Sequence, residues 1–145
     1  MAITQQTMTD EQRKSVALEY LKRLDRGENI FELFADDAQI YFPKWGLANG
    51  RAEFEKLFMD LGSILSAIRH DYAYFNYIVQ GDTVVVEGTS YGKTAKDVEW
   101  RAGVTHAGRW CDVFEIRDFK IQRCFIYLDP DYAGADTARY PWLNR

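Results

Sequence analysis

The sequence lacks the features that mark several common classes of protein. It has 18 Lys and Arg residues against 22 Asp and Glu, so its formal net charge is −4. Non-specific binding to nucleic acid or to an anionic membrane needs a basic face, and no run of Lys or Arg offers one. No segment approaches the ~20 apolar residues of a membrane span, and the first residues have no apolar signal-peptide core. We therefore expect a cytoplasmic protein without nucleic-acid or membrane partners.

Cysteine and histidine are also scarce, with two residues of each. Cys111 and Cys124 have no CxxC spacing and the histidines no HExxH spacing, so we expect no metal site and no cofactor. Without a signal peptide the two thiols are expected to be reduced, and a disulfide is the less favoured alternative. The 145 residues suit a single domain, with a core at about residues 10–131 and a polar tail at 132–145.

The first half of the chain predicts three helices. Residues 9–27 form an amphipathic pattern that opens with Thr9 and Gln12 in capping-box spacing and closes at Gly27. A short helix is predicted through Phe34, followed by a brief strand at 39–42. The third helix is predicted at residues 49–65. Its apolar face holds Phe54, Leu57, Phe58, Leu61 and Leu65.

The second half predicts strands. Residues 68–79 and 83–91 are rich in β-branched and aromatic residues and are joined at a hairpin turn, "QGD". Two more strands flank "RDFK", and a polar tail follows them. Helices first and antiparallel strands afterwards indicate an α+β fold.

One short stretch, "RWCDVFEI", combines an apolar strand face with a carboxylate. Side chains of a strand alternate between faces, so Trp110, Asp112 and Phe114 share one face. With a three-residue loop at residues 117–119, Asp112 would pair with Cys124. Asp112 is then the lone charge on its face, and it must be partnered, protonated or next to a wet cavity.

These elements resemble the SnoaL-like branch of the nuclear transport factor two superfamily. The most specific pieces are "LFADDA" and "DVFEIRDFKI", the latter with Phe119 where relatives usually have glycine. The resemblance implies a cone of three N-terminal helices against a strongly curved antiparallel sheet, open at one end to a pocket. It also implies a homodimer. The fold hosts isomerases, cyclases, dehydratases and non-catalytic binders, so it does not define a substrate.

Within that superfamily, ketosteroid isomerase implies roles for three positions. Its oxyanion-hole tyrosine and aspartate correspond to Tyr20 and Asp112. Its general-base aspartate corresponds to Phe42, so the oxyanion pair is retained and the base is absent. Scytalone dehydratase has a catalytic histidine near the position of His70. His106 shares the strand parity of Asp112 but lies ~20 Å away along an extended strand.

The resulting candidates are catalytic residues and pocket residues. The catalytic candidates are Asp112, Tyr20 and His70. The candidates for lining the pocket are Trp110, Phe42, Trp45, His106, Phe114, Ile126 and Leu128. Each also has a structural interpretation: Asp112 as a satisfied structural acid, Tyr20 as a core aromatic, and His70 as a surface residue.

Two functions are compatible with these residues. The first is a cofactor-independent isomerase, cyclase or dehydratase that acts on a small apolar carbonyl compound. Tyr20 and Asp112 would bind the developing oxyanion, and His70, or as the less favoured alternative His106, would move the proton. The second is a non-catalytic, dimeric ligand-binding or interaction module, which the missing base at Phe42 favours.

Overall fold

The computed structural model describes residues 7–144, in which two α-helices occur. Helix α1 (Asp10–Arg26) begins at the predicted capping box of Thr9 and Gln12 and ends at Gly27, whose φ is 69°. Helix α2 (Gly50–Ile64) buries Phe54 and Leu57, as its periodicity predicts. None of the helices in this range has the length and apolar character needed to cross a membrane.

The predicted short helix through Phe34 is wrong. Only a 3₁₀ turn forms there, η1 (Phe31–Leu33), and Phe34 already begins strand β1 (Phe34–Phe42). The reason is visible in the burial of β1, because Ala38, Ile40 and Phe42 are buried in the alternation of a strand. The described chain therefore has two α-helices against the sheet instead of three.

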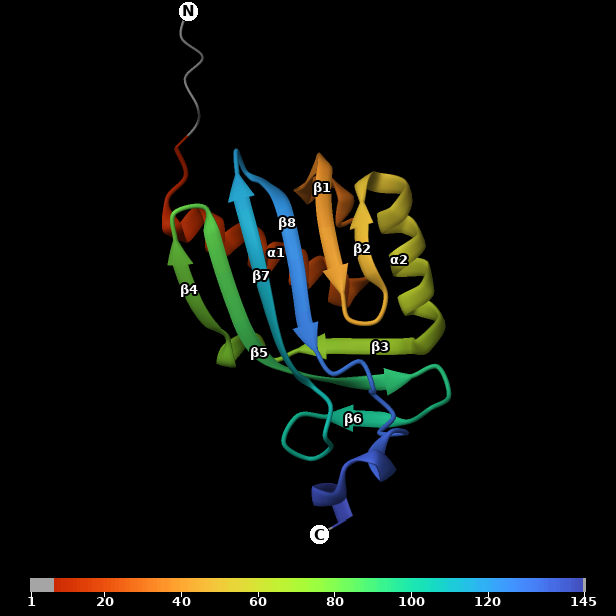
Figure 1. Ribbon diagram of the computed structural model, residues 1–145. Helices are drawn as coiled ribbons and strands as arrows, with labels where there is room; N and C mark the ends of the chain where they lie inside the picture. The colour runs from red at the N-terminus through yellow and green to blue at the C-terminus, as the bar shows by residue number, and fades with distance from the viewer. Residues whose placement is uncertain (1–6, 145) are drawn as a thin grey trace, which may run out of the picture.

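Eight strands form one curved sheet (Figure 1). Besides β1, they are β2 (Gly46–Asn49), β3 (Leu65–His70), β4 (Asn76–Gln80), β5 (Thr83–Thr94), β6 (Glu99–Arg101), β7 (Arg109–Arg117) and β8 (Lys120–Leu128). The order is β2-β1-β8-β7-β5-β3, with β4 and β6 also paired to β5. Strand β1 runs parallel to β8, so the sheet is mixed, and the expectation of a purely antiparallel sheet is wrong.

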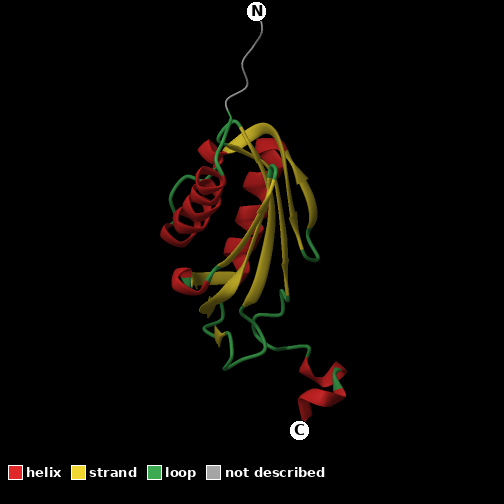
Figure 2. Cartoon of the chain, turned by 90° about the vertical axis from the view of Figure 1, so that its left-hand side faces the viewer, coloured by secondary structure: helices red, strands yellow, loops and turns green. Residues whose placement is uncertain are grey.

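Strand β5 changes partners along its length, and this gives the sheet its curvature. Its first half pairs with β4 and β7, and its second half, from Ser90, pairs with β3 and β6. The predicted single strand at 68–79 is correspondingly split by a 3₁₀ turn, η2 (Tyr72–Tyr74). Figure 2 shows both α-helices on the same side of the curved sheet. The hydrophobic core lies between these helices and the sheet.

The last hairpin keeps the predicted faces but not the predicted register. Asp112 pairs with Ile126 instead of Cys124, a shift of two residues. The loop has two residues, Asp118 and Phe119, both with positive φ (52° and 60°), as in a type I′ turn. A bulge on β8 takes up the remaining residue. Because the shift is even, Asp112 stays on the buried face.

The segment after β8 closes over the end of the sheet. Tyr132 packs on Trp100 with ring centroids 4.6 Å apart, and both side chains are buried. Two short 3₁₀ helices follow, η3 (Thr137–Arg139) and η4 (Pro141–Asn144). The two cysteines, Cys111 and Cys124, are free, as predicted. They lie on opposite faces of the sheet.

Candidate functional site

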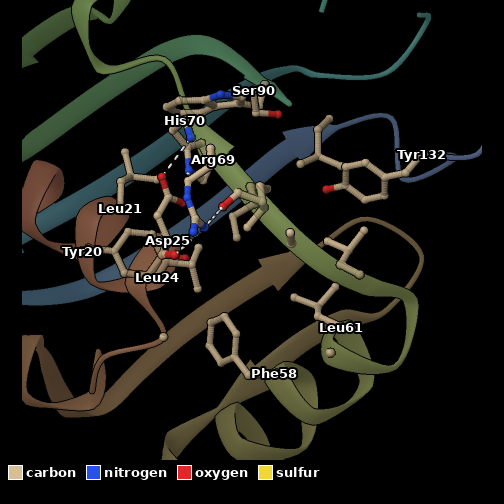
Figure 3. A pocket seen from close by; sticks show the side chains of 18 of the residues that line it. Tyr20, Leu21, Leu24, Asp25, Phe58, Leu61, Arg69, His70, Ser90 and Tyr132 are labelled. Atoms are coloured by element: carbon tan, nitrogen blue, oxygen red, sulfur yellow. Dashed lines mark hydrogen bonds and ion pairs between the residues drawn. The ribbon is translucent and has the colours of Figure 1, made fainter. Parts of the chain in front are cut away.

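A cavity of about 550 Å³ lies between the two helices and the inner face of the sheet (Figure 3). Its walls come from the last two turns of α1, the second half of α2, strand β3, and the inner face of β7 and β8. Phe42 and Tyr132 complete them. Two carboxyl groups and one imidazole among the lining side chains are buried, those of Asp25, Asp112 and His70, with exposures of 7%, 3% and 8%.

Asp25 and His70 form a buried pair at one side of the cavity. The His70 Nδ1 atom lies 2.6 Å from the Asp25 Oδ1 atom. The backbone N–H of His70 and the hydroxyl of Tyr72 both donate to Asp25 Oδ2, at 2.8 and 2.5 Å. Burial raises the pKa of Asp25, but these hydrogen bonds and the charge interaction with His70 outweigh it and leave that pKa below the usual value. Asp25 is therefore an ionised carboxylate.

The ionised state of Asp25 fixes the tautomer of His70. A carboxylate only accepts hydrogen bonds, so the proton of the neutral imidazole resides on Nδ1. Nε2 then carries the lone pair, and no residue between 7 and 144 hydrogen-bonds to it. This is how a carboxylate orients a histidine that acts as a general base.

Trp110 connects His70 to the strand that carries Asp112. The rings of His70 and Trp110 meet edge to face with centroids 5.1 Å apart. Gly88 makes room for the indole, because a Cβ at that position would lie 2.8 Å from Trp110 Cζ2. Trp110 and Asp112 are two residues apart on the same face of β7, so their Cα atoms are ~7 Å apart.

Asp112 has the opposite environment to Asp25. In the part of the chain that the structure describes, no hydrogen bond reaches its carboxyl group. Burial raises the pKa of Asp112 to about 8. At neutral pH Asp112 is thus a neutral carboxylic acid on the cavity wall, with a proton available for donation to a ligand oxygen.

Tyr20 lies on the same wall, and its hydroxyl is enclosed. The side chain is fully buried, with its ring packed edge to face on Phe34 and Phe114. Its Oη atom is sealed from solvent and has no hydrogen-bond partner among the described residues. Burial, followed by the neighbouring Cys124 and Asp112, raises the pKa of Tyr20 well above its usual value. The Nε1 atom of Trp110 is likewise buried and unpartnered.

The other candidates from the sequence divide into two groups. Phe42, Trp110, Ile126 and Leu128 line the cavity. Phe114 instead lies in the core beside it. The indole of Trp45 donates to Asp60 at 2.8 Å and lines a separate surface groove, and His106 is exposed on the loop before β7. His106 does not reach the cavity because its loop leaves the strand before Gly108.

Sequence reasoning did not identify Asp25 or Tyr72. Asp25 follows Leu21 by four residues and Ala17 by eight, so it lies on the buried stripe of α1. The argument that singled out Asp112 on a strand therefore applies to Asp25 on a helix. No group of three or more His, Cys, Asp or Glu side chains within the described residues could hold a metal ion.

Comparison with known proteins agrees with this fold. A model of the SnoaL-like domain family matches residues 18–124. A search of curated protein sequences returned no match. Among solved structures, TerC co-crystallised with polyporic acid has a TM-score of 0.69 at 17% identity, over 92% of this chain and 99% of that one.

Two further structures are similar over most of the chain. An NTF2-like protein from Burkholderia xenovorans LB400 has a TM-score of 0.68 at 16% identity, over 88% of this chain and 97% of that one. A proposed polyketide cyclase from Xanthomonas campestris pv. campestris has a TM-score of 0.67 at 16% identity, over 82% and 91%. At these identities the likeness shows the fold alone.

Proposed function

Since this chain belongs to the SnoaL-like domain family, we propose that it is a cofactor-independent acid–base enzyme of the isomerase, cyclase or dehydratase type. Its substrate is a small, mostly apolar carbonyl compound bound in the cavity of about 550 Å³. The observation that carries the proposal is the pair of buried aspartates with opposite protonation states. Groups whose surroundings drive their pKa values apart are suited to be the acid and the base of one reaction.

The chemistry follows from these protonation states. His70 Nε2 takes a proton from the carbon next to the substrate carbonyl. The electron pair of that C–H bond forms a C=C bond, and the π pair of the carbonyl moves onto its oxygen, which gives an enolate. Neutral Asp112 donates a hydrogen bond to this oxygen, and Asp25 stabilises the imidazolium that forms. The imidazolium then returns its proton to another carbon, or to a departing hydroxyl group. His70 thereby replaces the general base that is absent at Phe42.

Two of the similar structures support this class of substrate. One contains polyporic acid, and another is named as a proposed polyketide cyclase. The lining supports it too, because most of the side chains between His70 and Asp112 are apolar. An apolar wall with a few polar groups is typical of sites for small organic ligands.

A proton-exchange assay tests the proposal without knowledge of the natural substrate. The ketone 2-tetralone is incubated with the protein in D₂O, and loss of its α-protons is followed by proton NMR. We expect exchange above the buffer rate. His70→Gln should reduce it by about 100-fold or more, the usual contribution of a general base. Asp112→Ala should also slow it strongly.

His106→Gln is the matched control, because His106 is the other histidine and is exposed outside the cavity. It should exchange protons at the wild-type rate. Exchange that is equally fast in wild type and His70→Gln contradicts the assignment of the base.

The alternative is a non-catalytic pocket protein of the same fold. It is favoured by Phe42 at the position of the family base and by the enclosed hydroxyl of Tyr20. Under this alternative, ligands that raise the melting temperature emerge chemically unchanged, and no exchange above buffer is seen for any ligand that binds.

We also propose that the protein is a cytoplasmic homodimer. The outer face of β1 and β8 carries the aromatic side chains of Tyr41, Phe125 and Tyr127, whose rings lie within 6 Å of one another in two pairs. The guanidinium of Arg123 stacks on Phe125 at 3.8 Å. Aromatic and arginine side chains are enriched in interfaces. Sedimentation as a monomer at micromolar concentration would contradict the dimer.

A further inference from the structure

The rim of the cavity carries two arginine side chains that the proposed reaction does not use. Arg26 ends α1 and Arg69 lies on β3, and both line the cavity and are exposed. Arg26 already faces Glu28 at 3.6 Å. Among residues 7–144, no carboxylate lies within ion-pair distance of Arg69. Of the two arginines, Arg69 therefore places a positive charge without a carboxylate partner among the described residues at the cavity entrance, in a chain whose net charge is −4.

The guanidinium of Arg69 is held in place by the backbone. Its Nη1 atom donates to the carbonyl oxygens of Asp25 and Ile68, at 2.7 and 2.8 Å. Figure 3 shows it between the last turn of α1 and strand β3. Both N–H groups of Nη1 are thus used, while the side formed by Nε and Nη2 has no acceptor among the described residues. Two parallel N–H groups of this kind bind a carboxylate in bidentate fashion.

The cavity changes character from the rim inward. Apolar side chains make up much of the wall, namely Leu21, Leu24, Phe58, Leu61, Leu65 and Ile68. At the deep end lies Asp112. Arg69 pairs with Tyr91 and Asp112 with Val86, so they are five residues apart along β5. That is about 16 Å on a straight strand, and the bend of β5 shortens it.

We propose that the ligand is an amphipathic organic acid. Its carboxylate binds Arg69 at the rim, its apolar ring body fills the middle of the cavity, and its carbonyl oxygen faces Asp112. Arg26 adds positive charge at the same rim. This inference rests on the proposed small-molecule pocket, but it does not depend on catalysis, since a carrier of the same ligand would need the same rim.

The test compares two probes that share one ring system. 2-Naphthoate is an anion at pH 7, and 2-naphthamide is its neutral analogue of similar size. Binding of each is measured by isothermal titration calorimetry at low salt. The side-chain Nε–H signal of Arg69 is followed by NMR to locate the carboxylate. We expect naphthoate to bind about tenfold more tightly than naphthamide and to shift the Arg69 signal.

Three variants assign the preference to Arg69. Arg69→Gln should abolish the preference for naphthoate and leave naphthamide binding unchanged. Arg69→Lys keeps the charge without the planar fork, so it should retain only part of the preference. Arg51→Gln is the control. Arg51 is an exposed arginine on α2 that pairs with Glu55 away from the cavity, and its loss should change neither affinity.

The outcomes separate this inference from the proposed function. If naphthamide binds as tightly as naphthoate, the anion subsite is overturned and the pocket stands. If naphthoate is preferred but Arg69→Gln keeps the preference, the assignment to Arg69 is overturned. If neither probe binds, both the subsite and the small-molecule pocket are overturned. If naphthoate is preferred but the protein catalyses no proton exchange, only the proposed enzymatic activity is contradicted.

Discussion

Asp25 and Asp112 are both buried aspartates on the wall of one cavity, and they differ in the hydrogen-bond donors around them. Asp25 receives donors from the imidazole and backbone of His70 and from Tyr72. Asp112 receives none from the described residues, although it is as deeply buried, with 3% of its surface exposed against 7% for Asp25. Burial alone would raise the pKa of both carboxyl groups.

The comparison shows that donors, and not depth, decide which aspartate is charged. Three donors keep Asp25 ionised, so it can orient His70 as a base. The absence of donors keeps Asp112 protonated, so it can act as a hydrogen-bond donor. If this is correct, the same substitution, Asp to Asn, must have opposite consequences at the two positions.

The largest effect is expected for Asp112→Asn, on the pH dependence of the free energy of unfolding. Its folded-state pKa is about 8, above the ~3.9 of an unfolded chain. Between these two pKa values, the folded protein keeps the proton on Asp112 while the unfolded chain has lost it. The free energy of unfolding therefore falls as the pH rises from the lower pKa to the higher one. Asp112→Asn removes this dependence. The free energy of unfolding of the variant, relative to wild type, should rise by about 4 kcal/mol from pH 5 to pH 9.

Urea denaturation at both pH values measures this change. Asp36→Asn is the control, because Asp36 is an exposed aspartate on β1 outside the cavity. Its relative stability should not change between the two pH values. If the stability of Asp112→Asn relative to wild type also stays the same at both pH values, Asp112 is ionised in the folded protein.

The next effect concerns Asp25, with the opposite sign. Its folded pKa is lowered, so its ionised form stabilises the fold at neutral pH and loses this contribution as pH falls through the folded pKa. Asp25→Asn should lower the free energy of unfolding at pH 7 by about 3 kcal/mol, because it removes one partner of a buried pair. Urea denaturation at pH 7 measures it, and an unchanged or higher stability contradicts the ionised state.

Tyr72→Phe should have a smaller effect, because it removes one of three donors to Asp25. We expect a loss of about 1.5–2 kcal/mol at pH 7, the lower end of the range for a hydrogen bond to a charged group, because Tyr72 is partly exposed. The pKa of Asp25 should rise in this variant. Tyr74→Phe is the control, since Tyr74 lies on the same 3₁₀ turn and is 79% exposed.

The smallest effect is expected at Tyr20. Its hydroxyl is buried without a partner among the described residues, so Tyr20→Phe removes a polar atom that makes no hydrogen bond there. Stability should change by less than about 0.5 kcal/mol or increase slightly. A loss above 2 kcal/mol in thermal or urea unfolding would mean that this hydroxyl has a partner in the folded protein.

The sequence predicted Asp112 as a site residue but not Asp25. The reason is that buried positions recur with different spacing on a strand and on a helix. On a strand, alternate residues face the core, so a carboxylate among Trp110 and Phe114 is conspicuous. On α1 the buried stripe is flanked by charged residues such as Arg23 and Arg26, so Asp25 resembles one more surface charge. Its partners are also distant, because His70 follows 45 residues later.

In the last hairpin, the sequence predicted which face of the sheet each side chain occupies but not which residues pair. The hairpin loop at Asp118 and Phe119 requires two residues with positive φ, which Asp tolerates but Phe disfavours, so the sequence does not mark a two-residue loop there. The two-residue error left the faces intact. The parallel pairing of β1 with β8 joins segments about 85 residues apart, and no local pattern encodes such a contact.

The most direct test is the titration of both carboxyl groups by carboxyl-carbon NMR, assigned with Asp25→Asn and Asp112→Asn. The predicted result is a midpoint near 8 for Asp112 and a midpoint below the usual aspartate value for Asp25. A midpoint at or below the usual value for Asp112 would mean that both aspartates are ionised at neutral pH, and it would contradict the division into a neutral acid and a base-supporting carboxylate.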